Sequence, residues 1–253
     1  MGEICTVTGM VLSAMPIGEY DKRLVILTRE KGKISAFAKG ARKPGNPQMA
    51  GSRPFSFGEF DLFEGRSSYT VAAMRIQNYF EELGADLAGT MYGCYFLEFA
   101  GYYGRENIDG SEMIKLLYQS FRALLKVSLP DELVRRIFEL KLMVINGEYP
   151  NVFSCTGCKK KEDISHFFST ERNGLLCSEC ASFHQNEASV IPVLEATVYA
   201  MQYIITSPTE RLYTFTVKPE VLNELGRIMD MEITRYVDRR MKSLDILEGF
   251  IQS

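Results

Sequence analysis

The sequence predicts an α+β protein with a small N-terminal β-barrel and an α-helical domain into which a four-cysteine module is inserted. Three observations predict this fold class. Residues 1–80 contain five short segments rich in β-branched and aromatic residues, the period becomes helical from about residue 81, and two C-x2-C pairs follow later in the chain. We therefore expect a barrel domain at 1–80, a helical domain at 81–149 and 186–253, and a metal-binding module at 150–185.

The first domain is predicted to be a five-stranded Greek-key barrel, for which the OB-fold is the leading candidate. Gly, Pro, Asn or Ser residues bound the five expected strands, which are Cys5–Ala14, Arg23–Arg29, Lys33–Lys39, Phe55–Phe63 and Tyr69–Gln77. Glu30–Gly32 indicates a hairpin loop between the second and third strands. The basic, Gly- and Pro-rich stretch Gly40–Pro54 is too polar for a core and predicts a long, mobile loop.

Helices are expected after the barrel, from the spacing of apolar residues and from end signals. Pro130 and Gly147 bracket one helix, which begins with acidic residues, and Pro192 and Pro219 each open another. The expected helices are Leu87–Tyr103, Ser111–Lys126, Asp131–Asn146, Val193–Thr206 and a long last helix from Pro219.

The cysteines of the inserted module predict a structural zinc site. Two C-x2-C pairs, eighteen residues apart, supply the four soft donors of a tetrahedral Zn²⁺. The alternative is two buried or redox-active cysteine pairs. Catalytic zinc is not expected, because four thiolates leave no open position for water and neither His166 nor His184 has a ligand spacing. We expect one Zn²⁺ per chain, held by Cys155, Cys158, Cys177 and Cys180.

The sequence contains no motif of a common enzyme class. It has no G-x-x-x-x-G-K-[ST], G-x-G-x-x-G, G-x-S-x-G or H-E-x-x-H, so we expect a binding protein and not an enzyme. No stretch approaches 18 uncharged apolar residues, and residues 1–10 contain Glu3 and no long apolar run, so neither a membrane span nor a secretory leader is expected. Cys5 and Cys94 are expected as buried thiols, which fits a cytoplasmic protein.

Positive charge gathers in the predicted barrel. Residues 1–80 carry eleven Lys and Arg against seven Asp and Glu, whereas the remainder carries 18 against 25. Strand alternation places Lys33, Phe37 and Lys39 on one face of the third strand, opposite small and aliphatic residues. Cations for phosphates and a flat ring for a base suit single-stranded nucleic acid, bound without sequence preference. The alternative is that Phe37 packs under the helices and the lysines are only solvated.

Three stretches are more distinctive than the cysteine pairs. They are GEYDKRLVILTREKGKISAFAKGARKP at 18–44, RPFSFGEFDLFEGRSSYTV at 53–71 and YVDRRMKSLDIL at 236–247. With the order of barrel, helices, cysteine pairs and helices, they make the chain resemble the bacterial RecO family of DNA repair and recombination mediators. The resemblance implies a non-enzymatic protein, nucleoid-associated during repair. Such a protein binds single- and double-stranded DNA, anneals complementary strands and, with RecR, helps RecA to replace the single-strand-binding protein SSB.

The resemblance and the strand pattern together point to individual residues. The expected DNA contacts are Arg23, Lys33, Phe37, Lys39, Arg42, Lys43 and Arg53. The resemblance also implies contact with the acidic, apolar C-terminal tail of SSB. Candidate contacts on the Asp131–Asn146 helix are Arg136, Leu140 and Lys141, with helical core as the alternative role. The alternative function is a zinc-stabilised subunit of a nucleic-acid-modifying enzyme, and a third is an adaptor that binds protein only.

Overall fold

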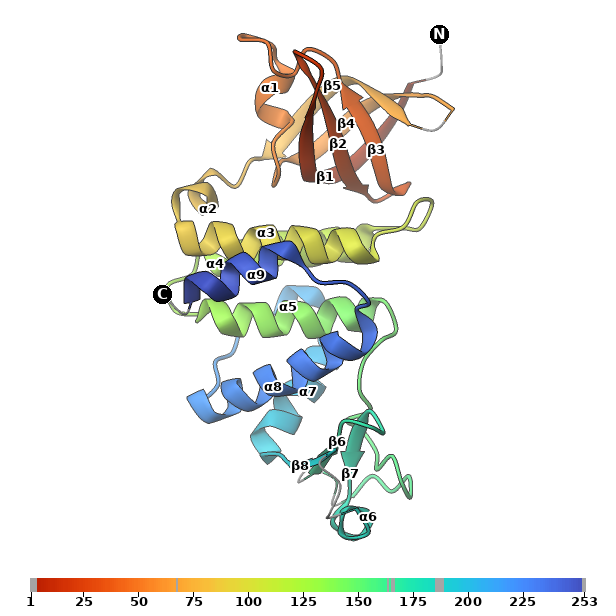
Figure 1. Cartoon of the computed structure of the whole chain (residues 1–253), viewed down its shortest axis with the longest axis vertical. Helices are drawn as coiled ribbons and strands as arrows, with labels where there is room; N and C mark the ends of the chain where they lie inside the picture. The colour runs from red at the N-terminus through yellow and green to blue at the C-terminus, as the bar shows by residue number, and fades with distance from the viewer. Residues whose placement is uncertain (1–3, 67, 163, 165–166, 185–188, 252–253) are drawn as a thin grey trace. The chain divides into compact units, whose positions relative to one another are not determined.

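The computed structural model describes residues 4–66, 68–162, 164, 167–184 and 189–251. Glu3, His166 and the predicted domain boundary at 185–186 lie outside the described residues. Contacts divide the chain into two compact units (Figure 1), which we call the barrel unit (Met1–Leu125 with Met241–Ser253) and the zinc unit (Lys126–Arg240), the second named only after the zinc site that its cysteine spacing predicts. The helices up to residue 125 therefore group with the barrel by contact, and the predicted division into three domains stays a prediction.

Five strands close into a barrel, as the sequence predicted. They are β1 (Ile4–Ile17), β2 (Asp21–Thr28), β3 (Gly32–Ala38), β4 (Phe57–Glu64) and β5 (Tyr69–Asn78). The order is β1-β2-β3-β5-β4, and β1 closes the barrel by pairing with both β2 and β4. Every pairing is antiparallel except that between β3 and β5. This is the five-stranded Greek-key arrangement of an OB-like barrel.

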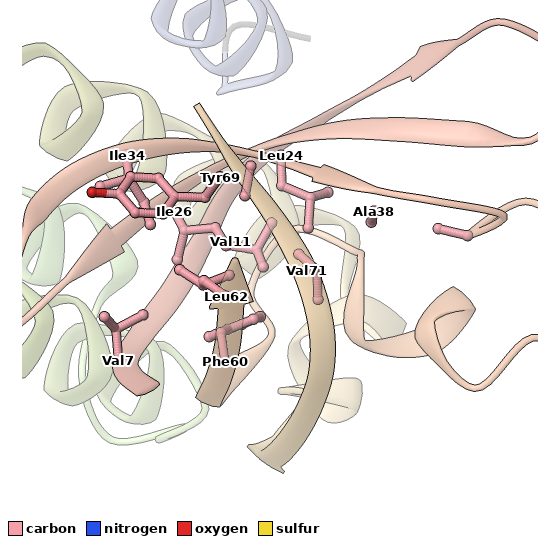
Figure 2. Close-up of a cluster of buried hydrophobic side chains, with 12 residues drawn as sticks. Val7, Val11, Leu24, Ile26, Ile34, Ala38, Phe60, Leu62, Tyr69 and Val71 are labelled. Atoms are coloured by element: carbon pink, nitrogen blue, oxygen red, sulfur yellow. The ribbon is translucent and has the colours of Figure 1, made fainter. Parts of the chain in front are cut away.

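The barrel interior is filled by aliphatic and aromatic side chains from all five strands. Figure 2 shows Val11, Leu24, Ile26, Phe60 and Leu62 converging on one another inside the barrel. In β3 every second residue faces this core, so that its aliphatic residues are buried while the residues between them are half-buried. The predicted alternation is therefore confirmed, and it leaves the second face of β3 available for polar contacts.

The segment between β3 and β4 is more ordered than the expected loop. It contains the short helix α1 (Gln48–Gly51), and Ala41 joins the barrel core. The Gln48 side-chain amide donates to the backbone oxygens of Val71 and Ala72 at 3.5 and 3.3 Å. A Cβ at Gly51 would lie 2.9 Å from side-chain atoms of β5, so only glycine fits there without rearrangement. The segment is a long connection between strands, as predicted, but part of it is helical and packs closely on β5 through a small residue.

Four helices complete the barrel unit. They are α2 (Glu81–Ala85), α3 (Leu87–Tyr103), α4 (Ser111–Leu124) and α9 (Lys242–Ile251). The predicted bounds of α3 are confirmed, and Asp86 begins the helix by accepting hydrogen bonds from the backbone of Ala88 and Gly89. Helices α2 and α9 were not predicted.

The N-terminus of helix α9 is capped by a side chain that is distant in the sequence. The Glu98 carboxylate, on α3, accepts hydrogen bonds from the backbone N–H groups of Lys242 and Ser243 at 3.3 and 2.8 Å. These are two of the donors that a helix leaves unpaired at its start, and the helix dipole favours a carboxylate there. Helices α3 and α9 accordingly lie side by side (Figure 1).

The zinc unit combines a helical bundle with a small sheet. Helix α5 (Asp131–Ile145) contacts α7 (Glu195–Thr206) and α8 (Pro219–Tyr236), and the 3-10 helix η1 (Thr209–Arg211) follows α7. The sheet has the order β7-β6-β8 and is formed by β6 (Phe167–Ser169), β7 (Gly174–Leu176) and β8 (Val190–Pro192). Pro192 thus ends a strand and does not open a helix, which corrects the predicted start of α7. No helix among the described residues is long and apolar enough to cross a membrane.

Candidate nucleic-acid surface and metal centre

The two cysteine pairs meet at one point of the zinc unit. The first pair lies in a turn before the sheet, and the second follows β7 and enters the short helix α6 (Ser178–Ser182). The sulfur atoms of Cys155, Cys158, Cys177 and Cys180 all lie within 4.8 Å of one another. The spacing of the cysteines predicted this cluster, and the fold brings it together.

The geometry of the cluster fits a tetrahedral metal ion. The Sγ atoms of Cys158 and Cys177 are 3.7 Å apart. Four sulfurs at about 2.3 Å from a central zinc would be separated by roughly 3.8 Å, because that is the edge of the tetrahedron. A Cβ at Gly157 would lie 2.9 Å from the Cys180 sulfur, so the turn needs glycine to let the two pairs approach. The cluster can therefore hold a metal ion without rearrangement of its backbone.

Backbone N–H donors favour the thiolate form of one of the four cysteines, which is the form that binds a metal ion. Burial alone would raise the pKa of Cys155, but backbone N–H groups of Cys177, Cys158 and Gly157 outweigh it and lower the pKa to about 6. Burial and hydrogen bonds with the other three sulfurs raise the pKa of Cys180 to about 12. The cluster thus offers a thiolate at one position and keeps a proton at another, and a metal ion must displace the remaining protons as it binds.

The predicted DNA contacts lie on β2, on β3 and in the segment between β3 and β4. Arg23 on β2 and Phe37 on β3 are register partners, and Lys39 follows directly after β3. Burial lowers the pKa of Lys22, and Arg53 and Arg42 lie close enough to lower it further. The fold therefore gathers cations from β2 and from both ends of the segment between β3 and β4.

These cations lack the carboxylate partners that neutralise other cations of the barrel. Arg75 pairs with Asp61 and Glu59, and Lys31 pairs with Glu64 at 3.3 Å. Within the described part of the chain, no ion pair is formed by five exposed residues: Arg23, Lys39, Arg42, Lys43 and Arg53. We call these five residues the unpaired basic surface. Their positive charge remains available to a polyanion.

Lys33 differs from the other predicted contacts because its ammonium is used inside the barrel unit. It donates to the backbone oxygen of Gly101 at 2.6 Å, which is one of the last four carbonyls of α3. Those carbonyls have no partner within the helix, and the helix dipole favours a cation there. Lys33 also lines a cavity of about 210 Å³ that contains Glu106. This position favours a structural contribution from Lys33, and its DNA contact stays a prediction.

Two residues of this region were not singled out from the sequence. The Lys22 ammonium donates to the backbone and hydroxyl oxygens of Ser52 at 3.1 and 2.9 Å, which holds the segment after α1 against the barrel. The Tyr20 ring lies 4.9 Å from the Lys43 ammonium. Neither role has a sequence signal beyond membership of the basic stretch, because both depend on how that segment folds back.

The predicted SSB-tail contacts on α5 are buried in the zinc unit. Arg136 donates to Glu132, Glu139 and Asp230, and the Lys141 ammonium donates to the backbone oxygens of residues 204, 205 and 207. Leu140 has no exposed surface. This burial favours the alternative role of helical core for these three side chains, and partner contact at them stays a prediction.

Comparison with known proteins covers nearly the whole chain. Residues 1–80 match a family model described as Recombination protein O N terminal, and residues 84–245 match one described as Recombination protein O C terminal. A DNA repair protein RecO of Alkaliphilus metalliredigens is 33% identical over 239 residues, which cover 94% of this chain and 96% of that protein. The same protein of Acetivibrio thermocellus is 30% identical, with 95% of each chain covered. These names describe DNA repair and mention no enzymatic reaction.

Proposed function

The chain belongs to the recombination protein O family of DNA repair proteins, and on that premise we propose that it is a mediator that binds single- and double-stranded DNA through its barrel. In this proposal it anneals complementary strands and, with RecR, promotes the loading of RecA on SSB-coated DNA. It acts in the cytoplasm, at the nucleoid during repair. It is not an enzyme, and in this proposal it acts by binding DNA strands.

The unpaired basic surface is the observation that supports DNA binding most directly. Among the residues that the structure describes, five exposed cations form no ion pair, on the same barrel in which Arg75 and Lys31 are neutralised. When such cations neutralise phosphates, the counterions condensed on the strand are released, so affinity depends on salt and not on base sequence. Phe37, half-buried beside Arg23, adds an aromatic side chain to this surface.

Replacing Lys39 and Arg42 together by alanine tests this proposal. If both side chains contact phosphate, the slope of log affinity against log salt becomes shallower by roughly one to two units, because about 0.7 counterions are released per contact on a single strand. The affinity for single-stranded oligonucleotides of any sequence falls alike. The measurement is fluorescence anisotropy of labelled oligonucleotides over a salt series.

Lys31→Ala is the matched control, since this barrel lysine is already paired with Glu64. It is expected to leave the salt slope nearly unchanged. An unchanged slope in the Lys39 and Arg42 double variant would show that the strand binds elsewhere.

We propose that the four-cysteine cluster holds one structural Zn²⁺. The sulfur spacing fits its tetrahedral geometry, and four thiolates are a donor set that zinc prefers. Such an ion has no position left for substrate or water, so it stabilises the fold of the zinc unit and takes no part in chemistry.

RecR, RecA and the SSB tail are proposed partners on the strength of the family alone. The burial of Arg136, Leu140 and Lys141 favours a packing role for these side chains. We therefore propose the SSB tail as a partner without assigning its binding site to these three positions.

A further inference from the structure

An open cleft lies in the barrel unit, beside the unpaired basic surface. It has a volume of about 520 Å³ and is formed by the turn between β1 and β2 together with the segment that follows β3. Tyr20, Glu19 and Asp21 line it from the turn, and Lys39 and Lys43 line it from the other side. Its volume lies within the range of small-molecule binding sites.

Tyr20 presents an aromatic ring to this cleft. Tyr20 is 41% exposed, whereas Phe60 and Tyr69 of the same barrel are buried in its core. The Lys43 ammonium lies 4.9 Å from the ring centroid, in the range of a cation–π contact. A hydrogen bond to Glu19 raises the pKa of the Tyr20 hydroxyl above its ordinary value.

The position of Tyr20 is fixed by the backbone around it. The Tyr20 carbonyl accepts the backbone N–H of Arg42 at 2.8 Å, and the Arg42 guanidinium donates to the Gly18 carbonyl at 3.3 Å. Across the cleft, Asp21 accepts the backbone N–H of Gly40 at 2.7 Å. These contacts tie the turn to the segment after β3, so the backbone that carries the ring is held in place before any ligand arrives.

The charges of the cleft suit a neutral ligand with polar edges. Lys39 and Lys43 line the cleft together with Glu19 and Asp21 but form no ion pair with them in the described structure, so the lining has no net charge while both ammonium groups can contact a phosphate at its rim. Excess positive charge lies next to it, where Arg42 and Arg53 surround Lys22. A strand whose phosphates follow these cations would bring a base, which is neutral, to the cleft.

We propose that this cleft is a subsite for one nucleobase of a bound single strand, with the Tyr20 ring as the stacking surface and Lys43 as a phosphate contact at its rim. The subsite rests on the proposed function and adds to it a base-binding residue. Every base has a flat face, so the subsite accepts any of the four, and stacking on an aromatic side chain adds affinity that salt does not remove.

Tyr20→Leu tests the subsite with two probes of equal phosphate number, a single-stranded oligonucleotide and an abasic oligomer of the same length. Loss of one stacked base is expected to weaken binding of the oligonucleotide by between about fivefold and a hundredfold. Binding of the abasic oligomer and the salt slope are expected to stay unchanged. An equal loss for both probes, or no loss for either, would overturn the subsite.

Tyr20→Trp provides a direct readout, because the chain contains no tryptophan. Stacking of a base on the introduced indole is expected to quench its fluorescence when the oligonucleotide binds, and the abasic oligomer is expected to leave it unchanged. Tyr79→Trp is the matched control, since Tyr79 is equally exposed at 40% and lies beyond the end of β5, outside the cleft.

The two proposals fail in different ways. Salt-dependent binding by the unmodified protein, without quenching at Tyr20→Trp, overturns the subsite and leaves the proposed function intact. Absence of binding by the unmodified protein overturns both.

Discussion

Exchange of Cys177 for serine is expected to empty the metal centre and to unfold the module around it. Cys177 has no exposed surface, its sulfur lies 3.7 Å from that of Cys158, and it also accepts the backbone N–H of Cys180 at 3.4 Å. A structural zinc ion contributes about 10–16 kcal/mol to the folding of a small zinc-finger peptide, which exceeds what the short strands β6 to β8 can supply. The variant is expected to lose solubility or to melt at a markedly lower temperature.

Elemental analysis and thermal unfolding measure this effect. Chelator-washed, folded protein is expected to hold one zinc per chain, and Cys177→Ser none. Cys94→Ser is the matched control, because this lone cysteine on α3 belongs to the barrel unit and is not part of the cluster. A zinc-free protein of unchanged melting temperature would contradict the structural role of the metal.

Glu139→Ala is expected to be the second most damaging substitution, at about 3–5 kcal/mol of unfolding free energy. The Glu139 carboxylate is fully buried and accepts hydrogen bonds from Arg135 at 2.8 Å and from Arg136 at 3.0 Å. Burial opposes the charge of both guanidiniums, but Glu139 raises their pKa, so both remain charged. Removal of the carboxylate leaves two buried positive charges with fewer negative neighbours.

Denaturant unfolding of the metal-loaded protein checks this expectation, with Glu112→Ala as the control. Glu112 also pairs with a cation on its own helix, Lys115 at 2.9 Å, but it is 58% exposed. Exposed pairs of this kind contribute less than about 1 kcal/mol. A Glu139→Ala variant as stable as the control would show that the α5 network is not structural, and would revive a partner role for Arg136.

The barrel could be predicted because its signals are local. Two-residue alternation along β3 reports which side chains face the core, and turn residues mark where each strand ends. The small sheet of the zinc unit could not be predicted in the same way, since each of its strands has three residues and too few positions to show a period.

Elements that depend on distant residues could not be predicted either. The N-terminus of helix α9 is capped by Glu98 of α3, and the segment after α1 is held by a hydrogen bond from Lys22. On α5, Arg136 was a candidate partner contact with helical core as the alternative, and its hydrogen bonds to Glu139 and to Asp230 on α8 favour the core. In each case a long-range partner decides the role of a polar residue, and no local pattern reports it.

In the candidate site, too, features with a local sequence signal could be predicted and features that depend on distant residues could not. Cysteine spacing predicted the metal cluster, because a tetrahedral ion dictates the spacing of its ligands. The basic stretch predicted where DNA would bind, but it did not separate Lys33, which donates to the end of α3, from Lys39, which is exposed. A count of charges does not distinguish the two lysines, whereas in the folded protein Lys33 alone of the two donates to a helix carbonyl.

Annealing of two complementary oligonucleotides, without nucleotide or added metal ion, tests the central claim most directly. The account predicts that the unmodified protein accelerates annealing, that Lys39→Ala with Arg42→Ala slows it towards the rate without protein, and that Lys31→Ala does not. Annealing by the double variant at the rate of the unmodified protein would contradict the claim that the unpaired basic surface holds the strands.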